Sequence, residues 1–406
     1  MDSFTQVLLG AAVGDAVMGR QVGKKALLWG GVCGLFPDLD ILVPFSDAVK
    51  NFTYHRSASH SLFVLAVLTP LFVRLIARLH PSTSEYRFRW TVMVYLAFAT
   101  HVLLDSFTVY GTQIFWPLPT PPEMWSTIFI IDPAYSLPLL GGVLAALVLS
   151  RKTSTGWMFN AAGLALSTLY LTWSAGAKLY VTEKAEDSLL RQNIAYEKVL
   201  TVPSPFNTLL WRVLAMDGGG YYEGFYSLMD GKKELSFTRY NSREDLLAPV
   251  SDHWPVRRLK WFTHGFYAVD QEGQDVVITD LRMGMEPGYI FQFKVAEVVE
   301  GQVRPVPNRR IERPLRWEQL RWVWQRIWQP EPLPTRLSAQ SRDPVDPAVS
   351  TSNTAAAGAF PASCPGDVER FPQKTATAAF RQAPGSEGSA SFHPIAEQIF
   401  QIASAI

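Results

Sequence analysis

The 406-residue sequence has very few cysteines and almost no net charge. Its two cysteines are Cys33, inside an apolar run, and Cys364, in a low-complexity region. They provide neither a disulfide framework nor a cysteine-rich zinc site, so any bound metal must use histidine and carboxylate ligands. The net charge is +1, from 37 basic and 36 acidic side chains. The chain lacks the positive excess of a nucleic-acid-binding protein, and we expect no nucleic-acid partner.

Charged residues make up only 18% of the chain, against 48% hydrophobic residues, and the apolar residues crowd into its first part. Six apolar segments span residues 4–19, 26–45, 61–79, 90–110, 133–150 and 157–177. Several approach the roughly 20 residues that a helix needs to cross the hydrocarbon core. We therefore predict that residues 1–180 form a mainly α membrane helical bundle of five to six apolar helices in contact with the lipid bilayer.

The first apolar segment is the weakest candidate for a crossing. It is short and rich in glycine and contains Asp15, so it also fits a re-entrant or buried helix. Asp2 directly follows Met1, and the apolar stretch has neither a charged region before it nor a small-residue cleavage site after it. We expect no cleaved signal peptide.

Basic residues gather in three connections, at residues 20–25, 74–89 and 151–152. If all six segments cross, these connections share one side, which the positive-inside tendency assigns to the cytoplasm. Lys50 and Arg56 are exceptions on the opposite side. The pattern predicts a multi-pass protein of the cytoplasmic membrane whose region after Lys178 is extracytoplasmic.

Residues 181–330 contain short apolar and aromatic runs separated by turn signals. Runs at residues 209–215, 221–228, 261–269, 276–281 and 289–299 are typical of strands and predict a small β-rich extramembrane domain. Residues 331–406 are rich in Pro, Ser, Ala and Gly. Such a segment cannot bury enough apolar area to offset the entropy of ordering, so we predict a low-complexity, disordered tail.

A Pro37-Asp38-Leu39-Asp40 motif ends the second apolar segment. The proline restricts the geometry of the residue before it, and the two aspartates are too close in sequence to share a helix face, so the motif predicts a helix interruption that presents carboxylates. Carboxylate oxygens suit divalent metals. The alternative is a solvated helix end at the membrane surface.

A second motif, His55-Arg56-Ser57-Ala58-Ser59-His60, precedes the third apolar segment. A loop entering a helix can bring its two imidazoles together, and neutral imidazole is the commonest metal ligand in proteins. Arg56 is suited to binding an anionic oxygen of a substrate. Surface histidines are common, so this motif alone is also compatible with no site.

His101 and Asp105 lie within the fourth apolar segment. Their i, i+4 spacing places both side chains on one helical face. Burying them in a bilayer helix is costly unless they pair with each other, bind a metal or line a wet cavity. A structural His–Asp hydrogen bond is the alternative.

In the six-crossing topology the three motifs approach the same outer surface. They supply six candidate metal ligands, namely Asp38, Asp40, His55, His60, His101 and Asp105. Asp132, before Pro133, either joins them or begins a helix. Asp15 lies near the cluster only if its segment is re-entrant.

These motifs resemble those of the YdjM/YbcI-like family of bacterial inner-membrane proteins, some LexA-regulated, that are described as membrane-bound metal-dependent hydrolases. The resemblance rests on the opening Met1-Asp2-Ser3-Phe4-Thr5, Gly10, Gly14-Asp15, the three motifs above, Tyr110-Gly111-Thr112 and residues 205–212. Many relatives look as though they place a histidine directly after the early threonine, where this chain has Gln6.

The resemblance implies an inner-membrane metal-dependent hydrolase whose six matching residues hold a divalent cation. We expect zinc or manganese in preference to magnesium, because the ligands mix imidazole and carboxylate. The metal would activate water, His60 or Asp105 would act as general base, and Arg56 would stabilise developing negative charge. A lipid-linked or phosphoester compound is the expected substrate class. The alternatives are an ion or proton transporter and a noncatalytic membrane scaffold with a structural polar cluster.

Overall fold

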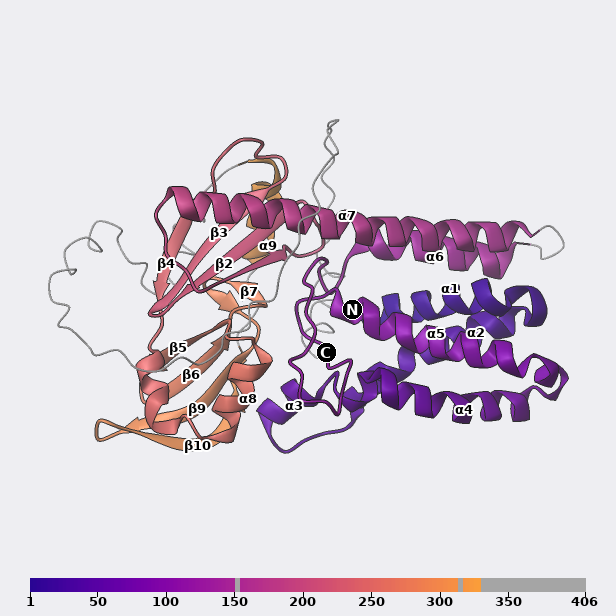
Figure 1. Ribbon diagram of the computed structural model, residues 1–406, viewed down its shortest axis with the longest axis horizontal. Helices are drawn as coiled ribbons and strands as arrows, with labels where there is room; N and C mark the ends of the chain where they lie inside the picture. The colour runs from indigo at the N-terminus through magenta and orange to yellow at the C-terminus, as the bar shows by residue number, and fades with distance from the viewer. Residues whose placement is uncertain (150–153, 313–316, 330–406) are drawn as a thin grey trace, which may run out of the picture. The chain divides into compact units, whose positions relative to one another are not determined.

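The structure is a computed structural model that describes residues 1–149, 154–312 and 317–329. The disordered tail predicted for residues 331–406 lies outside the described residues. The chain begins with a helical region and continues into a region of β-sheets (Figure 1). The helical region contains α1 (Ser3–Val22), α2 (Lys24–Leu35), η1 (Phe36–Leu42), α3 (Ala48–Tyr54), η2 (Ala58–His60), α4 (Leu62–Leu79), η3 (Pro81–Tyr86), α5 (Arg87–Ser106), α6 (Pro133–Val148) and α7 (Thr155–Arg191).

The predicted number of membrane-crossing helices is wrong by the criterion of length and apolar composition. Among the described residues, α4 is the one helix that meets both requirements. Helix α2 has 12 residues and extends about 18 Å, well short of a bilayer core. Helix α6 is apolar but has 16 residues. Helices α1 and α5 are long enough, but they bury polar side chains that include Gln6 and Asp15 in α1 and His101 and Asp105 in α5.

The helix α4 presents an apolar stripe on its outer face. Phe63, Val67, Leu71 and Leu75 are all exposed and recur every four residues, so they lie along one side of the helix. The opposite side, with Leu65 and Ile76, is buried against the bundle. An exposed apolar stripe on a helix of membrane-crossing length is the surface that lipid would cover.

Helices α1 and α2 form the closest helix pair of the region. Gly10 and Gly14 of α1 face Gly30 and Gly34 of α2, and a Cβ atom added at any of the four would collide with backbone of the other helix. Both pairs have the small-xxx-small spacing that lets helix backbones approach closely. The first apolar segment therefore forms a largely buried helix that packs closely against α2 at these glycines.

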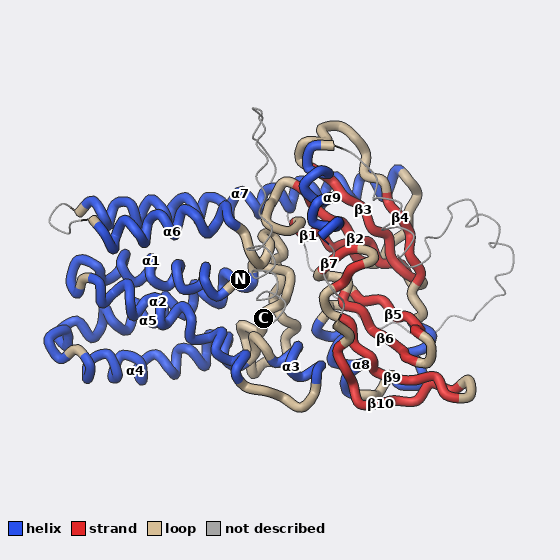
Figure 2. Tube along the Cα trace, turned by 180° about the vertical axis from the view of Figure 1, so that it is seen from behind, coloured by secondary structure: helices blue, strands red, loops and turns tan. Residues whose placement is uncertain are grey.

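The β region contains two four-stranded antiparallel sheets and a two-stranded hairpin (Figure 2). The first sheet has the order β1-β2-β3-β4, from β1 (Lys198–Pro203), β2 (Leu210–Asp217), β3 (Gly220–Ser227) and β4 (Phe237–Asn241). The second has the order β10-β9-β6-β5, from β5 (Tyr267–Glu272), β6 (Asp275–Asp280), β9 (Gln292–Val299) and β10 (Gln302–Arg310). The hairpin pairs β7 (Gly284–Met285) with β8 (Gly288–Tyr289).

Four of the five predicted runs are strand over most of their length, but the run at residues 261–269 is wrong in its first part. Trp261 and Phe262 end α8 (Trp254–Phe262), and β5 starts only at Tyr267. Pro255 opens this helix, and Val256, Leu259 and Phe262 bury one face of it. Two further short helices are η5 (Glu244–Val250) and α9 (Trp317–Trp328).

Helix α7 belongs to both regions. Its 37 residues extend roughly 55 Å. Leu164 and Leu171 pack against the core formed by α1 and α6, whereas Val181 and Ala185 share a core with Trp211 of the first sheet. A second link is a core in which side chains of α3 and of the segment after α5 pack with those of both sheets. The predicted start of the β-rich domain at residue 181 therefore falls inside a continuous helix.

Candidate metal centre

Four of the six predicted ligands converge at one buried point. Asp38 lies in η1 directly after α2, His60 ends η2 before α4, and His101 and Asp105 lie on the last turns of α5. One ligand atom from each lies within 4.8 Å of the other three. All four side chains are at most 4% exposed. Three elements distant in sequence thus bring two imidazoles and two carboxylates together.

The distances fit a divalent metal ion. His60 Nε2 lies 3.2 Å from His101 Nε2, 3.5 Å from Asp38 Oδ1 and 3.1 Å from Asp105 Oδ2. His101 Nε2 lies 3.4 Å from the same Asp38 oxygen and 3.6 Å from the same Asp105 oxygen. Tetrahedral bonds of about 2.0–2.1 Å require ligand atoms about 3.3 Å apart. Five of the six distances among the four ligand atoms are thus within a few tenths of an ångström of this value, and the set is suited to one metal ion.

Hydrogen bonds at the far side of each imidazole direct its Nε2 atom toward the centre. His101 Nδ1 lies 2.7 Å from the Gly34 carbonyl oxygen, which can only accept, so Nδ1 carries the proton. Ser59 Oγ donates to Asp40 at 2.6 Å and can then accept from His60 Nδ1 at 2.9 Å. Both Nε2 atoms can therefore present lone pairs, as metal ligation requires.

The two carboxylates are held in the same manner. Asp38 Oδ2 accepts from Ser3 Oγ at 2.9 Å, and its Oδ1 atom is buried with no hydrogen-bond partner among the described residues. Asp105 Oδ1 accepts from Gln6 Nε2 at 2.9 Å and from the amino group of Met1. The remaining oxygen of each carboxylate faces the centre, where a cation would satisfy it.

Asp40 and His55, the other two predicted ligands, form an outer layer. His55 Nδ1 donates to Asp40 Oδ1 at 2.7 Å, and Asp40 Oδ2 accepts from Ser59 Oγ and from the Arg56 backbone N–H at 3.0 Å. Asp40 Oδ2 lies 3.7 Å from His60 Nδ1, on the side of that ring away from the centre. Asp40 thus orients His60 through Ser59 and also fixes the His55 ring.

Arg56 is buried beside the centre and contacts protein groups on several sides. Its Nε atom lies 3.2 Å from Asp105 Oδ2, and one of its terminal nitrogens donates to Thr108 Oγ1 at 3.2 Å. The guanidinium also lies over the Tyr110 ring, 5.0 Å from its centroid. Arg56 has a φ of 60°. This left-handed backbone conformation is energetically unfavourable for any residue other than glycine. Strained backbone of this kind concentrates at functional sites.

The environment affects the two histidines of the loop before α4 in opposite ways. Burial lowers the pKa of His55 below its ordinary value, although Asp40 opposes this effect. Burial also disfavours a charged His60, but hydrogen bonds to Asp105 and Asp38 outweigh burial and raise the pKa of His60 to about 9. The carboxylates of Asp38 and Asp105 therefore favour a positive charge at the centre, either a protonated imidazole or a metal cation.

Asp15 and Asp132 do not join the four ligands. Asp15 lies nine residues along α1 from Gln6, about 13 Å on a regular helix. Asp132 caps α6 by accepting from the Ala134 backbone N–H, and it also accepts from the Tyr170 hydroxyl at 2.9 Å. Asp132 therefore has the helix-starting role that was one of its two predicted alternatives.

Among the residues that orient the ligands, Ser59 lies in the motif before the third apolar segment, but the sequence motifs did not indicate three others. Ser3, Gln6 and Gly34 each hold one ligand in place, and none has a side chain that suggests metal chemistry. One of them, Ser3, belongs to the opening segment that carries the family resemblance. Gln6 is fully buried and also donates to the His101 carbonyl at 3.1 Å.

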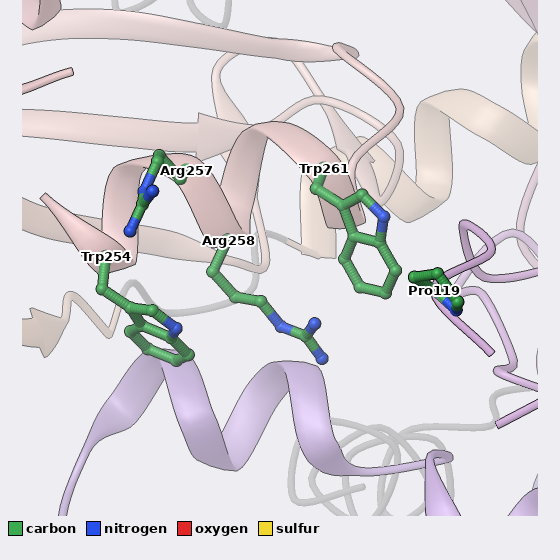
Figure 3. A pocket seen from close by; sticks show the side chains of 5 residues that line it. All are labelled: Pro119, Trp254, Arg257, Arg258 and Trp261. Carbon is green, nitrogen blue, oxygen red and sulfur yellow. The ribbon is translucent and has the colours of Figure 1, made fainter. Parts of the chain in front are cut away.

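A separate pocket lies between α8 and the segment before α6 (Figure 3). It has a volume of about 360 Å³ and is lined by Pro119, Trp254, Arg257, Arg258 and Trp261. Arg258 donates to the Thr53 carbonyl, two residues before His55, but no ligand of the candidate centre lines the pocket. Of the six predicted ligands Asp40 has the most exposed side chain, at 14%. The cluster is therefore closest to the protein surface at Asp40.

Within the described residues, the fold and this cluster define a helical region that has one helix of membrane-crossing length and composition and a candidate metal centre where α1 and α4 begin and α5 ends. A family model described as YdjM inner membrane protein matches residues 1–181. This match confirms the resemblance for the helical part of the chain. Neither a curated protein nor a solved structure matches the chain.

Proposed function

We propose that the protein is a membrane-bound metal-dependent hydrolase. The observation that carries this proposal is the convergence of Asp38, His60, His101 and Asp105 at metal-ligand distances in a buried position. Zinc or manganese suits a set of two imidazoles and two carboxylates better than magnesium, which prefers oxygen ligands and water. When bound, such an ion lowers the pKa of water and polarises a substrate oxygen.

Within this proposal, His60 and Asp105 serve as ligands and the general base lies elsewhere. Their centre-facing atoms would bind the cation and would then not be available as proton acceptors. His55 is better placed for this role because Asp40 holds its Nδ1 proton, and its Nε2 atom is buried without a hydrogen-bond partner in the described part of the chain. A carboxylate that orients an imidazole in this way is the usual arrangement of a histidine base. Arg56 stabilises negative charge next to Asp105.

We propose a lipid-linked substrate, such as a phosphoester with an apolar tail. Leu39, Ile41, Leu42 and Val43 are all exposed, with fractions from 42% to 73%. They surround or directly follow the two aspartates of η1. An exposed apolar edge next to the most accessible side of the cluster suits a substrate that approaches from the bilayer.

The His55→Gln variant tests the assignment of the base. We expect it to retain the metal of the wild-type chain, because the four ligands are unchanged, and to lose turnover by about 10²- to 10⁴-fold. The measurement combines metal analysis of the purified full-length chain with hydrolysis of a panel of lipid-linked phosphoesters. His253→Gln, in the β region, is the control and should keep both properties. Metal loss in His55→Gln would instead identify this residue as a ligand.

A noncatalytic scaffold with a structural metal is the second candidate. It is favoured by the near-complete burial of four protein ligands, since structural zinc sites are closed whereas catalytic sites keep an open position. Under this alternative, metal removal lowers thermal stability, and none of the panel is hydrolysed at any metal supplementation. Metal-dependent turnover by the wild-type chain, abolished in Asp38→Asn, would exclude it.

We also propose that the β region is extracytoplasmic and lies on the same side of the membrane as the cluster. Phe52 of α3 and Tyr110 after α5 share a core with Phe262 and Phe293 of the β region, which supports this placement.

Cysteine labelling tests this placement. A cysteine introduced at Gly273, in an exposed turn with no atom near its Cβ position, should react with an impermeant maleimide in intact cells lacking their outer membrane. A cysteine at Lys24, in the connection predicted to be cytoplasmic, should react only after lysis. The reverse pattern would contradict the proposal. The native Cys33 is fully buried and should not react, and Cys364→Ser in both variants removes the second native thiol.

A further inference from the structure

We propose that the groove between α4 and α5 is a binding site for an anionic phospholipid. The groove has a volume of about 490 Å³ and is lined by Pro70, Val73, Arg74, Ala77, Arg78, Arg87 and Thr91. It lies at the end of α4 that is remote from the candidate metal centre, with Arg74 about 20 Å along the helix from His60. The site is thus independent of the proposed hydrolase chemistry.

Three arginines gather at the end of this groove. Arg74 and Arg78 are one helical turn apart on α4, and Arg87 begins α5 after the short connection η3. All three are exposed, and none forms a salt bridge with another described residue. Glu85, the acidic residue of η3, forms no ion pair with any of the three arginines. Exposed guanidinium groups that form no ion pair with a described residue suit a phosphate group.

The rest of the groove is apolar and follows α4. Pro70, Val73 and Ala77 lie on consecutive turns of the one helix that has the length and composition to cross a bilayer. Proline and alanine leave space beside the helix, and the neighbouring face carries the exposed stripe of Phe63, Val67, Leu71 and Leu75. An acyl chain would lie along this surface with its phosphate among the arginines.

The arginines therefore suit the phosphate of a phospholipid and the apolar part of the groove suits its acyl chain. The two lie one after the other along α4, as headgroup and acyl chain do in a bilayer. Basic pockets between membrane helices commonly bind anionic headgroups at the membrane surface. A free phosphate would use only the arginines, and a second protein helix would need only the apolar part. The combination favours a lipid with an anionic headgroup, such as phosphatidylglycerol.

Titration of the full-length chain in neutral detergent with phosphatidylglycerol, monitored by native mass spectrometry, tests this inference. A basic side chain near an anionic surface contributes roughly fivefold to affinity, so R74Q/R78Q/R87Q should weaken binding about a hundredfold. The matched control R20Q/K24Q/K25Q also removes three charges, outside the groove, and should change affinity less than about twofold. Phosphatidylcholine should bind the wild-type chain much more weakly than phosphatidylglycerol.

Two further measurements distinguish the lipid from other occupants. Ala77→Phe fills the apolar part without removing charge and should weaken phosphatidylglycerol binding at least about tenfold. Glycerol phosphate, which lacks acyl chains, should not compete at equal concentration. Equal loss of affinity in both triple variants, no effect of Ala77→Phe, or full competition by glycerol phosphate would each overturn the proposal.

Discussion

The His101→Gln and Asp38→Asn variants are expected to bind a divalent cation at least about a hundredfold more weakly than the wild-type chain. Each variant replaces one of four groups whose ligand atoms lie within 4.8 Å of one another. Changes to the outer partners of metal ligands already cost about 10- to 100-fold in affinity, so loss of a direct ligand should cost at least as much. The effect should be visible as loss of co-purified metal and as a higher dissociation constant on titration with zinc or manganese.

Asp132→Asn is the matched control for these variants. Asp132 is fully buried in the helical region, as Asp38 nearly is, but it caps α6 and lies outside the group of four. The control should keep its metal even if its stability falls. Circular dichroism and elution from size-exclusion chromatography establish that each variant is folded. Folded ligand variants with wild-type metal content would show that the cluster is not the metal site.

The sequence motifs contain all six side chains that gather in the cluster, but they did not predict the division of these side chains into an inner and an outer layer. His101 and Asp105 could be anticipated because ionisable residues in an apolar helix need a partner, and their spacing puts them on one face. Asp38 and Asp40 could not be distinguished from spacing alone. They lie in η1, a 3-10 helix with three residues per turn, in which positions two apart point in different directions. Only tertiary structure shows that Asp38 faces the centre and that Asp40 faces the loop of His55.

For the fold as well, local sequence patterns predicted some features, whereas others depend on tertiary packing. The change from long apolar segments to short strand-like runs predicted a helical region followed by sheets, as the structure shows. The number of crossings was overestimated because α1 and α2 use glycine and buried polar residues to pack against neighbours. Hydrophobic residues in such segments reflect burial inside protein as much as contact with lipid. The continuity of α7 into the β region has no local signal, because its two halves pack against different cores.

The Gly30→Leu variant is expected to have the largest effect on the fold. A Cβ atom at this position would collide with the Gly10 carbonyl and lie 3.0 Å from Gly14 Cα, and both contacts are with backbone that cannot rotate away. Overpacking of this kind costs about 1–3 kcal/mol even where side chains can adjust, and here α1 and α2 must separate. We expect a loss of thermal stability of several degrees or failure to accumulate in the membrane.

Separation of α1 from α2 should also release the bound metal, and this consequence links the packing to the site. Helix α1 carries Gln6, which holds Asp105, and α2 carries the Gly34 carbonyl, which holds His101. Gly176→Leu in α7 is the matched control, because no atom lies within 4 Å of its Cβ position. This control removes a helical glycine at no steric cost and should be as stable as the wild-type chain or more so. A Gly30→Leu chain with normal stability and metal content would show that the close approach of α1 and α2 does not position the ligands.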